Sequence, residues 1–152
     1  MNTIAIVVHL LSAVVWVGGM FFAWVCLRPV AAVQLEPALR LPLWISVLGR
    51  FFTWVWIAVV LLPVSGAWMI VRVFGGMAAA PLYVHLMLGV GTAMILIFLH
   101  VFWAPYRALR RAVTQGDLKE GGRRLAQIRR LIGINLILGI LVVIIASGGR
   151  AL

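Results

Sequence analysis

Four long uncharged segments constrain this chain more than any other feature of its sequence. Residues 3–27, 51–71, 82–104 and 131–147 contain no Asp, Glu, Lys or Arg. About 20 apolar residues are needed to cross the hydrocarbon core of a membrane as a helix. None of the four segments alternates apolar and polar residues as the strands of a membrane barrel do. The sequence therefore predicts an all-α fold, a transmembrane four-helix bundle that makes residues 1–152 a single integral membrane domain.

Composition argues against a soluble globular protein. Hydrophobic residues make up 65% of the chain and only three residues are acidic, which is more apolar surface than a soluble domain of this length can bury. The formal net charge of +10 raises the question of nucleic acid. The basic residues flank the apolar segments instead of forming one face, so we expect the lipid bilayer as partner and no nucleic acid. Cys26 is the only cysteine, which excludes an intramolecular disulfide.

Proline and glycine residues mark the limits of the spans. Residues 75–76 and Pro81 predict the second connection, and Pro105 predicts the end of the third helix. Pro63 lies within the second span, where it should free a backbone carbonyl that Ser65 or a neighbour must satisfy.

Basic residues are distributed unevenly between the connections. Residues 105–130 carry eight of them, the first connection carries three, and the opposite side has only Arg72 and Arg150. Because basic connections stay in the cytoplasm, we expect both termini on the periplasmic side of a bacterial-type inner membrane. Residues 117–130 allow two interpretations: a loop that its arginines anchor at the headgroups, or an amphipathic extension of the fourth helix.

Three histidines lie inside the predicted spans, and an ionisable group in a membrane is costly enough to suggest a function. His9 and His85 lie near the start of the first and third spans, which run in the same direction. We therefore expect both in the outer leaflet at similar depth. His100 follows His85 by fifteen residues, about 22 Å along a helix. The spacing predicts that His9 and His85 share a ligand, and that His100 is a second site or an interfacial anchor.

This pair of histidines favours haem b, since neutral imidazole is the usual axial ligand of haem iron. Trp16 lies on the same helical face as His9. Gly89 lies one turn from His85, where the missing side chain leaves room for a flat macrocycle or for another helix. Two cations are available on the outer side for haem propionates, Arg72 and Arg150. The leading hypothesis is a haem protein that transfers electrons to a redox partner, or oxidises a hydrophobic substrate, within the bilayer.

Copper is the alternative ligand. Imidazole and thioether groups are ligands that copper accepts, and His9 and His85 would be its first ligands. Four further candidates are weaker. His100 lies far from the depth of the other two histidines, and Met87, Met94 and Met20 form no repeated cluster. A third hypothesis is a ligand-free assembly or scaffold subunit whose histidines only make hydrogen bonds between helices. Beside the lipid, the expected partner is a redox protein or a second copy of the chain in a homo-oligomer.

The pattern at residues 9–19, a histidine followed seven residues later by Trp and then by Gly-Gly, resembles the first helix of the CopD family. The resemblance covers nearly the whole chain, including Arg-Phe-Phe at 50–52, Tyr-Val-His at 83–85 and the stretch 130–135. It implies an inner-membrane protein linked to copper uptake or tolerance. More distantly, the chain resembles the HemJ family of protoporphyrinogen oxidases, in which His9 matches the histidine of the first helix. That family has His-x-Lys in its third helix, where this chain has Met87, so this resemblance implies haem binding more than porphyrinogen oxidation.

Overall fold

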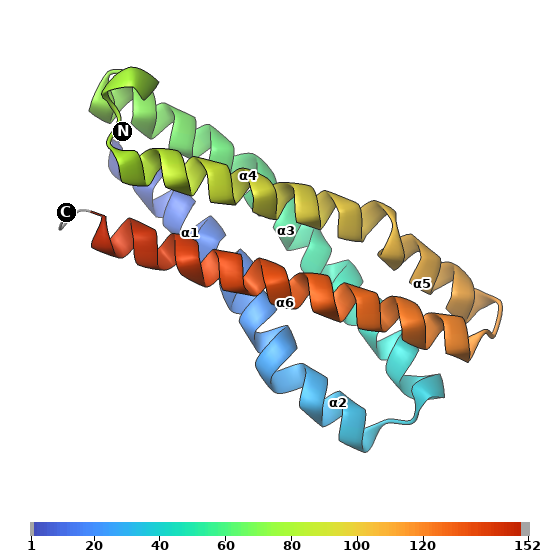
Figure 1. Cartoon of the computed structure of the whole chain (residues 1–152). Helices are drawn as coiled ribbons and strands as arrows, with labels where there is room; N and C mark the ends of the chain where they lie inside the picture. Colours follow the sequence, from blue (N-terminus) through green and yellow to red (C-terminus); the bar gives the residue numbers. More distant parts are fainter. Residues whose placement is uncertain (1, 150–152) are drawn as a thin grey trace.

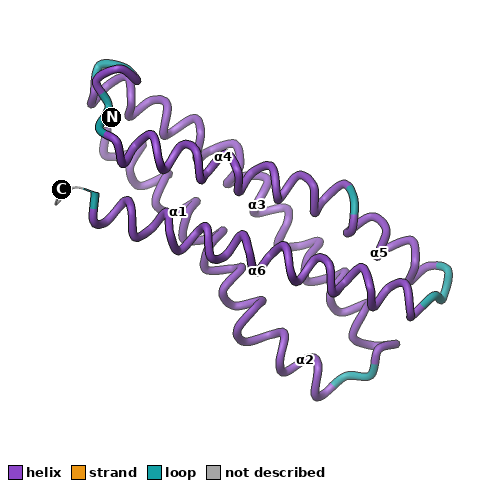
Figure 2. Tube along the Cα trace, in the orientation of Figure 1, coloured by secondary structure: helices purple, strands orange, loops and turns teal. Residues whose placement is uncertain are grey.

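The computed structural model describes residues 2–149, and all regular structure in that range is helical (Figure 1; Figure 2). Four helical runs are long and apolar enough to cross a membrane: Thr3–Gln34, Pro37–Phe74, Leu82–Thr114 and Leu118–Gly148. In chain order the elements are α1 Asn2–Phe21, the π-helix η1 Phe22–Leu27, α2 Arg28–Gln34, α3 Pro37–Phe74, the short 3₁₀ helix η2 Met77–Ala79, α4 Leu82–Trp103, α5 Pro105–Thr114 and α6 Leu118–Gly148. The predicted all-α bundle with four spanning helices is confirmed.

The breaks at residues 75–81 and at Pro105 lie where glycine and proline predicted them. Gly75 ends α3 with φ at +74°, in the left-handed region that residues with a side chain rarely adopt. Pro81 precedes the first residue of α4 in an extended conformation. Pro105 takes the first position of α5. A backbone N–H at that position has no acceptor within the helix, so proline costs no hydrogen bond there.

The helices extend beyond the predicted spans at one end of the bundle, which we call the basic end. α3 begins at Pro37 instead of residue 51, and α6 begins at Leu118 instead of residue 131. Each extension adds about 20 Å of helix. Residues 105–130 are therefore mostly helical. Residues 118–130 form an extension of the fourth helix, as the second of the two interpretations predicted, and not an anchored loop.

Local capping and apolar packing explain the extension of α6. The Asp117 side chain accepts a hydrogen bond from the backbone N–H of Glu120 at 2.9 Å, which satisfies one free donor of the first turn. Further along α6, Leu125 and Ile128 are almost completely buried. A Cβ on Gly121 would lie 2.8 Å from Cδ1 of Leu41 on α3. The extension of α6 is thus held against that of α3 by close contact.

The spanning helices form two packed pairs. α1 lies along α3, while α4 and α5 lie along α6 (Figure 1). α1 begins and α6 ends at the same end of the bundle, which we call the terminal end. The outward faces are apolar: Val14, Val64 and Ile137 are 66%, 63% and 67% exposed. Such a surface suits a bundle surrounded by lipid.

Candidate functional site

His9 is the histidine that the structure joins to another helix. Its Nδ1 lies 2.8 Å from Oγ of Ser65 on α3, near the terminal end of the bundle. The side chain is half-buried. Along α1 the same face continues with Ser12, Trp16 and Met20, all buried. The face that helical spacing predicted for His9 and Trp16 is therefore the inward face of α1.

The hydrogen bonds of Ser65 determine which nitrogen of His9 carries the proton. The Ser65 hydroxyl donates to the backbone carbonyl of Leu61, so its oxygen accepts from the imidazole. Nδ1 is then the protonated nitrogen of neutral His9, and Nε2 keeps its lone pair. Within residues 2–149, Nε2 has no hydrogen bond and is not among the buried unpaired atoms. Metal-binding histidines have this arrangement, in which the second ring nitrogen donates to an oxygen.

The local sequence of α3 makes room for this imidazole. A Cβ on Gly66 would lie 3.5 Å from Cε1 of His9, so the ring lies against the helix backbone. Pro63 lacks the N–H that would reach the carbonyl of Val59. The expected rescue of that carbonyl by Ser65 does not occur, because the hydroxyl bonds carbonyls of the next turn instead. Ser65 serves as the acceptor for His9.

His85 has a different environment. Its side chain is exposed, and Nδ1 lies 3.2 Å from the backbone oxygen of Pro81 in its own helix. Gly89, one turn further on, is exposed, and nothing lies within 4 Å of its Cβ position. α4 packs along α6, whereas His9 faces α3. The contacts of the described residues do not join His9 to His85, so a site shared by the two stays a prediction.

The other predicted ligands and propionate partners are dispersed. His100 is exposed in the last turn of α4, and Met87 is half-buried in an earlier turn. Arg72 is exposed, with its guanidinium carbon 5.2 Å from the centroid of a neighbouring tryptophan ring. Arg150 lies outside the described residues. Within residues 2–149 no group of three His, Cys, Asp or Glu side chains could hold a metal ion together.

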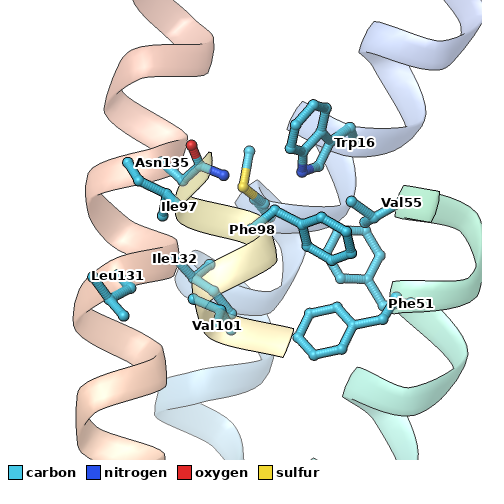
Figure 3. Close-up of a pocket in the computed structure, with 11 residues that line it drawn as sticks. Trp16, Phe51, Val55, Ile97, Phe98, Val101, Leu131, Ile132 and Asn135 are labelled. Carbon is cyan, nitrogen blue, oxygen red and sulfur yellow. The ribbon is translucent and has the colours of Figure 1, made fainter. Parts of the chain in front are cut away.

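A small hollow lies inside the bundle, with Trp16, Met20 and Asn135 among its lining residues (Figure 3). The volume of this cavity is about 10 Å³, which is room for about one water molecule. Asn135 is 3% exposed and donates from Nδ2 to the backbone oxygen of Met94 at 3.3 Å. Its Oδ1 has no partner within residues 2–149. Met20 and Met94 are both buried, so two thioethers and one unpaired oxygen occupy the interior.

This hollow does not fit a haem. Ligand pockets for molecules of that size measure roughly 300 Å³ or more. Around the hollow, the ring of Phe98 meets those of Trp16 and Phe52 edge-on, with centroids 6.2 and 5.5 Å apart. These aromatic contacts pack the interior around the hollow. The described interior gives the haem hypothesis no support, and haem binding stays a prediction.

The sequence did not identify Ser65 on α3 as a part of the site. The sequence predicted a hydrogen bond from Ser65 to a backbone carbonyl. It did not predict one with His9, which is 56 residues away in the chain. Met69 lies one turn beyond Ser65 and is half-buried, so it shares the same face nearer the terminal end. The Ser-Gly pair at residues 65–66, small and polar inside an apolar span, was the available signal.

Comparison with known families gives one match. The family model for CopD, Copper resistance protein D, matches residues 45–148. That range holds most of α3 and all of α4, α5 and α6, and it leaves out α1 with His9. Among curated proteins and among solved structures, none matches the chain.

Proposed function

Because the chain belongs to the CopD family of copper resistance proteins, we propose that this multi-pass inner-membrane protein binds copper ions inside its bundle and passes them along it. His9 is the proposed ligand at the terminal end. Copper takes precedence over haem b here, since the family name points to copper and the hollow beside Trp16 is too small for a macrocycle.

The hydrogen bond between His9 and Ser65 is the observation that carries this proposal. It leaves Nε2 with a lone pair and without a protein partner among the described residues. Imidazole is a ligand that copper accepts readily. An ion can bind Nε2 without breaking a hydrogen bond between protein groups of the described residues.

Buried thioethers continue from His9 into the bundle. Met20 follows His9 by eleven residues, about 16 Å along the helix, so the two would be successive positions of an ion and not one site. Met20 lines the hollow together with Asn135, whose Oδ1 supplies an unpaired oxygen. Soft thioether ligands favour Cu(I). We therefore propose Cu(I) as the ion that the protein handles.

Copper content of cells tests the function. Cells of one strain carry an empty vector, the wild type, His9→Ala or His100→Ala at equal membrane levels, and total copper is measured by mass spectrometry. We expect wild type and His100→Ala to change the copper content alike, and His9→Ala to abolish the change. Equal copper in all four strains would exclude copper handling, and an equal loss in both variants would remove the special role of His9.

Purified protein tests the ligand directly. Titration of Cu(I) against a colorimetric chelator gives the Cu(I) affinity in detergent. We expect His9→Ala to weaken this affinity by at least tenfold, because even losing a hydrogen bond behind a metal ligand weakens metal binding by about that factor. The visible absorption spectrum of the same sample addresses the haem hypothesis. A Soret band that disappears in His9→Ala would favour haem over copper.

A further inference from the structure

Three arginines from three helices lie close together at the basic end of the bundle. Arg28 begins α2, and its guanidinium carbon lies 3.8 Å from the ring centroid of Trp24. Arg40, in the first turns of α3, donates from Nη1 to the backbone oxygen of Ala32 at 3.3 Å, so it lies against α2 as well. Arg129 belongs to the extension of α6.

A close contact between η1 and α6 places Arg28 beside Arg129. A Cβ on Gly133, one turn after Arg129, would lie 2.5 Å from Nε1 of Trp24, so a glycine is needed for this approach. The ring face of Trp24 carries the guanidinium of Arg28, a cation–π contact. The indole therefore holds Arg28 next to the stretch of α6 that contains Arg129.

Among the described residues no ion pair joins any of these three arginines to a carboxylate, including the exposed Glu36, which lies four residues before Arg40. Both ion pairs in that part of the chain join Glu120 to arginines of its own helix. Arg129 precedes the apolar stretch of α6, and burial lowers its pKa, which the positive charges of Arg28 and Arg40 lower further. Like charges that share a half-buried place repel each other. A bound anion would relieve that repulsion.

Two buried N–H groups in this region also have no acceptor within residues 2–149: Nε of Arg129 and Nε1 of Trp44. Trp44 is 2% exposed. It lies one turn after Arg40 on α3, so the two share a helix face. Buried donors without a partner are rare in native proteins and are costly, most of all when charged. An acceptor oxygen of a negative group would satisfy each of these donors.

We propose that Arg28, Arg40 and Arg129, together with the indole N–H of Trp44, bind a phosphate group. The planar guanidinium fork matches phosphate oxygens and binds two of them at once. The cluster lies where the apolar part of α6 begins, the depth at which phospholipid headgroups lie, and the charge distribution assigns this end to the cytoplasm. An anionic phospholipid and free phosphate share this chemistry, and the depth favours the lipid. The site is separate from His9 and does not depend on copper.

Lipid retention by the purified protein tests the site. The protein in mild detergent is incubated with phosphatidylglycerol or with zwitterionic phosphatidylcholine, and bound lipid is measured by native mass spectrometry. Arg129→Gln removes the central guanidinium, while Arg110→Gln removes an equal charge from the exposed face of α5. We expect wild type and Arg110→Gln to retain phosphatidylglycerol equally, and Arg129→Gln to bind it about tenfold more weakly.

A second arm separates the two sources of phosphate. Thermal unfolding is compared in inorganic phosphate and in chloride at equal ionic strength. Stabilisation by phosphate that is lost in Arg129→Gln, without retained lipid, would assign the site to a free anion. Arg28→Gln, which leaves α6 unchanged, is expected to weaken binding in the same direction. If neither lipid retention nor phosphate stabilisation differs between these variants and Arg110→Gln, the proposal is overturned.

Discussion

Replacing Ser65 by alanine tests whether this hydroxyl prepares His9 for a metal ion. The substitution removes the acceptor that lies 2.8 Å from Nδ1 of His9 and leaves the imidazole itself in place. Without that acceptor, either ring nitrogen can carry the proton and the ring is no longer held in one orientation. We expect Cu(I) binding to weaken although the proposed ligand is unchanged.

The Ser65→Ala substitution should reduce the stability of the protein and its Cu(I) affinity by different amounts. Ser65 is 5% exposed, and losing one hydrogen bond between neutral groups lowers the free energy of unfolding by about 1 kcal/mol. Losing the hydrogen-bond partner behind a metal ligand lowers metal affinity by about 10- to 100-fold, which equals roughly 1.4 to 2.8 kcal/mol. The loss of binding energy should therefore exceed the loss of stability.

Thr92→Ala is the matched control. The Thr92 hydroxyl donates to the backbone oxygen of Leu88 at 2.8 Å in α4, as Ser65 does in α3, so both variants lose a hydroxyl of the same kind. Cu(I) affinity by chelator competition and thermal unfolding in detergent are measured on the same samples. Equal Cu(I) affinity in the two variants would refute the reasoning, and so would an affinity loss no larger than the loss of stability.

Close helix packing, the buried amide and the first turn of α6 each give a further prediction. Gly19→Ala places a Cβ against the ring of Phe51 and should lower the free energy of unfolding by about 1–3 kcal/mol, whereas Gly18→Ala, with nothing within 4 Å, should not; equal melting temperatures in detergent would contradict this. Asn135→Leu removes a buried unpaired oxygen together with the hydrogen bond to Met94; because the unpaired oxygen costs more than that bond contributes, we expect the free energy of unfolding to rise by about 1 kcal/mol, and a lower melting temperature in detergent would contradict this. Hydrogen bonds from two arginines lower the pKa of Glu120 from 4.5 to about 2, so its stabilising contribution is complete above about pH 4.5 and is lost as the pH falls towards 2. Melting temperatures at about pH 5 and about pH 3 should differ more in the wild type than in Glu120→Gln; an equal difference would contradict the ion pair.

The spans were predictable because a membrane leaves few alternatives. A backbone in lipid must satisfy its own hydrogen bonds, so an uncharged segment of sufficient length becomes a helix, and Gly75 and Pro105 then mark where helices end. The extensions of α3 and α6 were not determined in this way. In the extension of α6 the apolar positions, such as Leu125, are scattered among arginines, and whether they are buried depends on a partner helix such as the one that supplies Leu41.

The candidate site was predictable only in part. Helical periodicity alone placed His9 and Trp16 on one face of α1, and counting residues gave the depth of each histidine along the bundle. Depth suggested His85 as a second ligand beside His9, which stays a prediction, but it gave no indication of Ser65, the hydrogen-bond partner that the structure gives His9. The reason is that several helices carry polar groups at one depth, and depth does not say which of them faces which.

The sequence by itself determined that this chain crosses the membrane four times and which residues share each helix face, because both depend on hydropathy and on the helical period. The tertiary structure decided which faces meet. That choice brought Ser65 to His9 and placed Arg28 beside Arg129. Such pairings depend on the close fit of side chains on both helices, as where Gly133 admits the ring of Trp24, and no single segment of sequence contains that information.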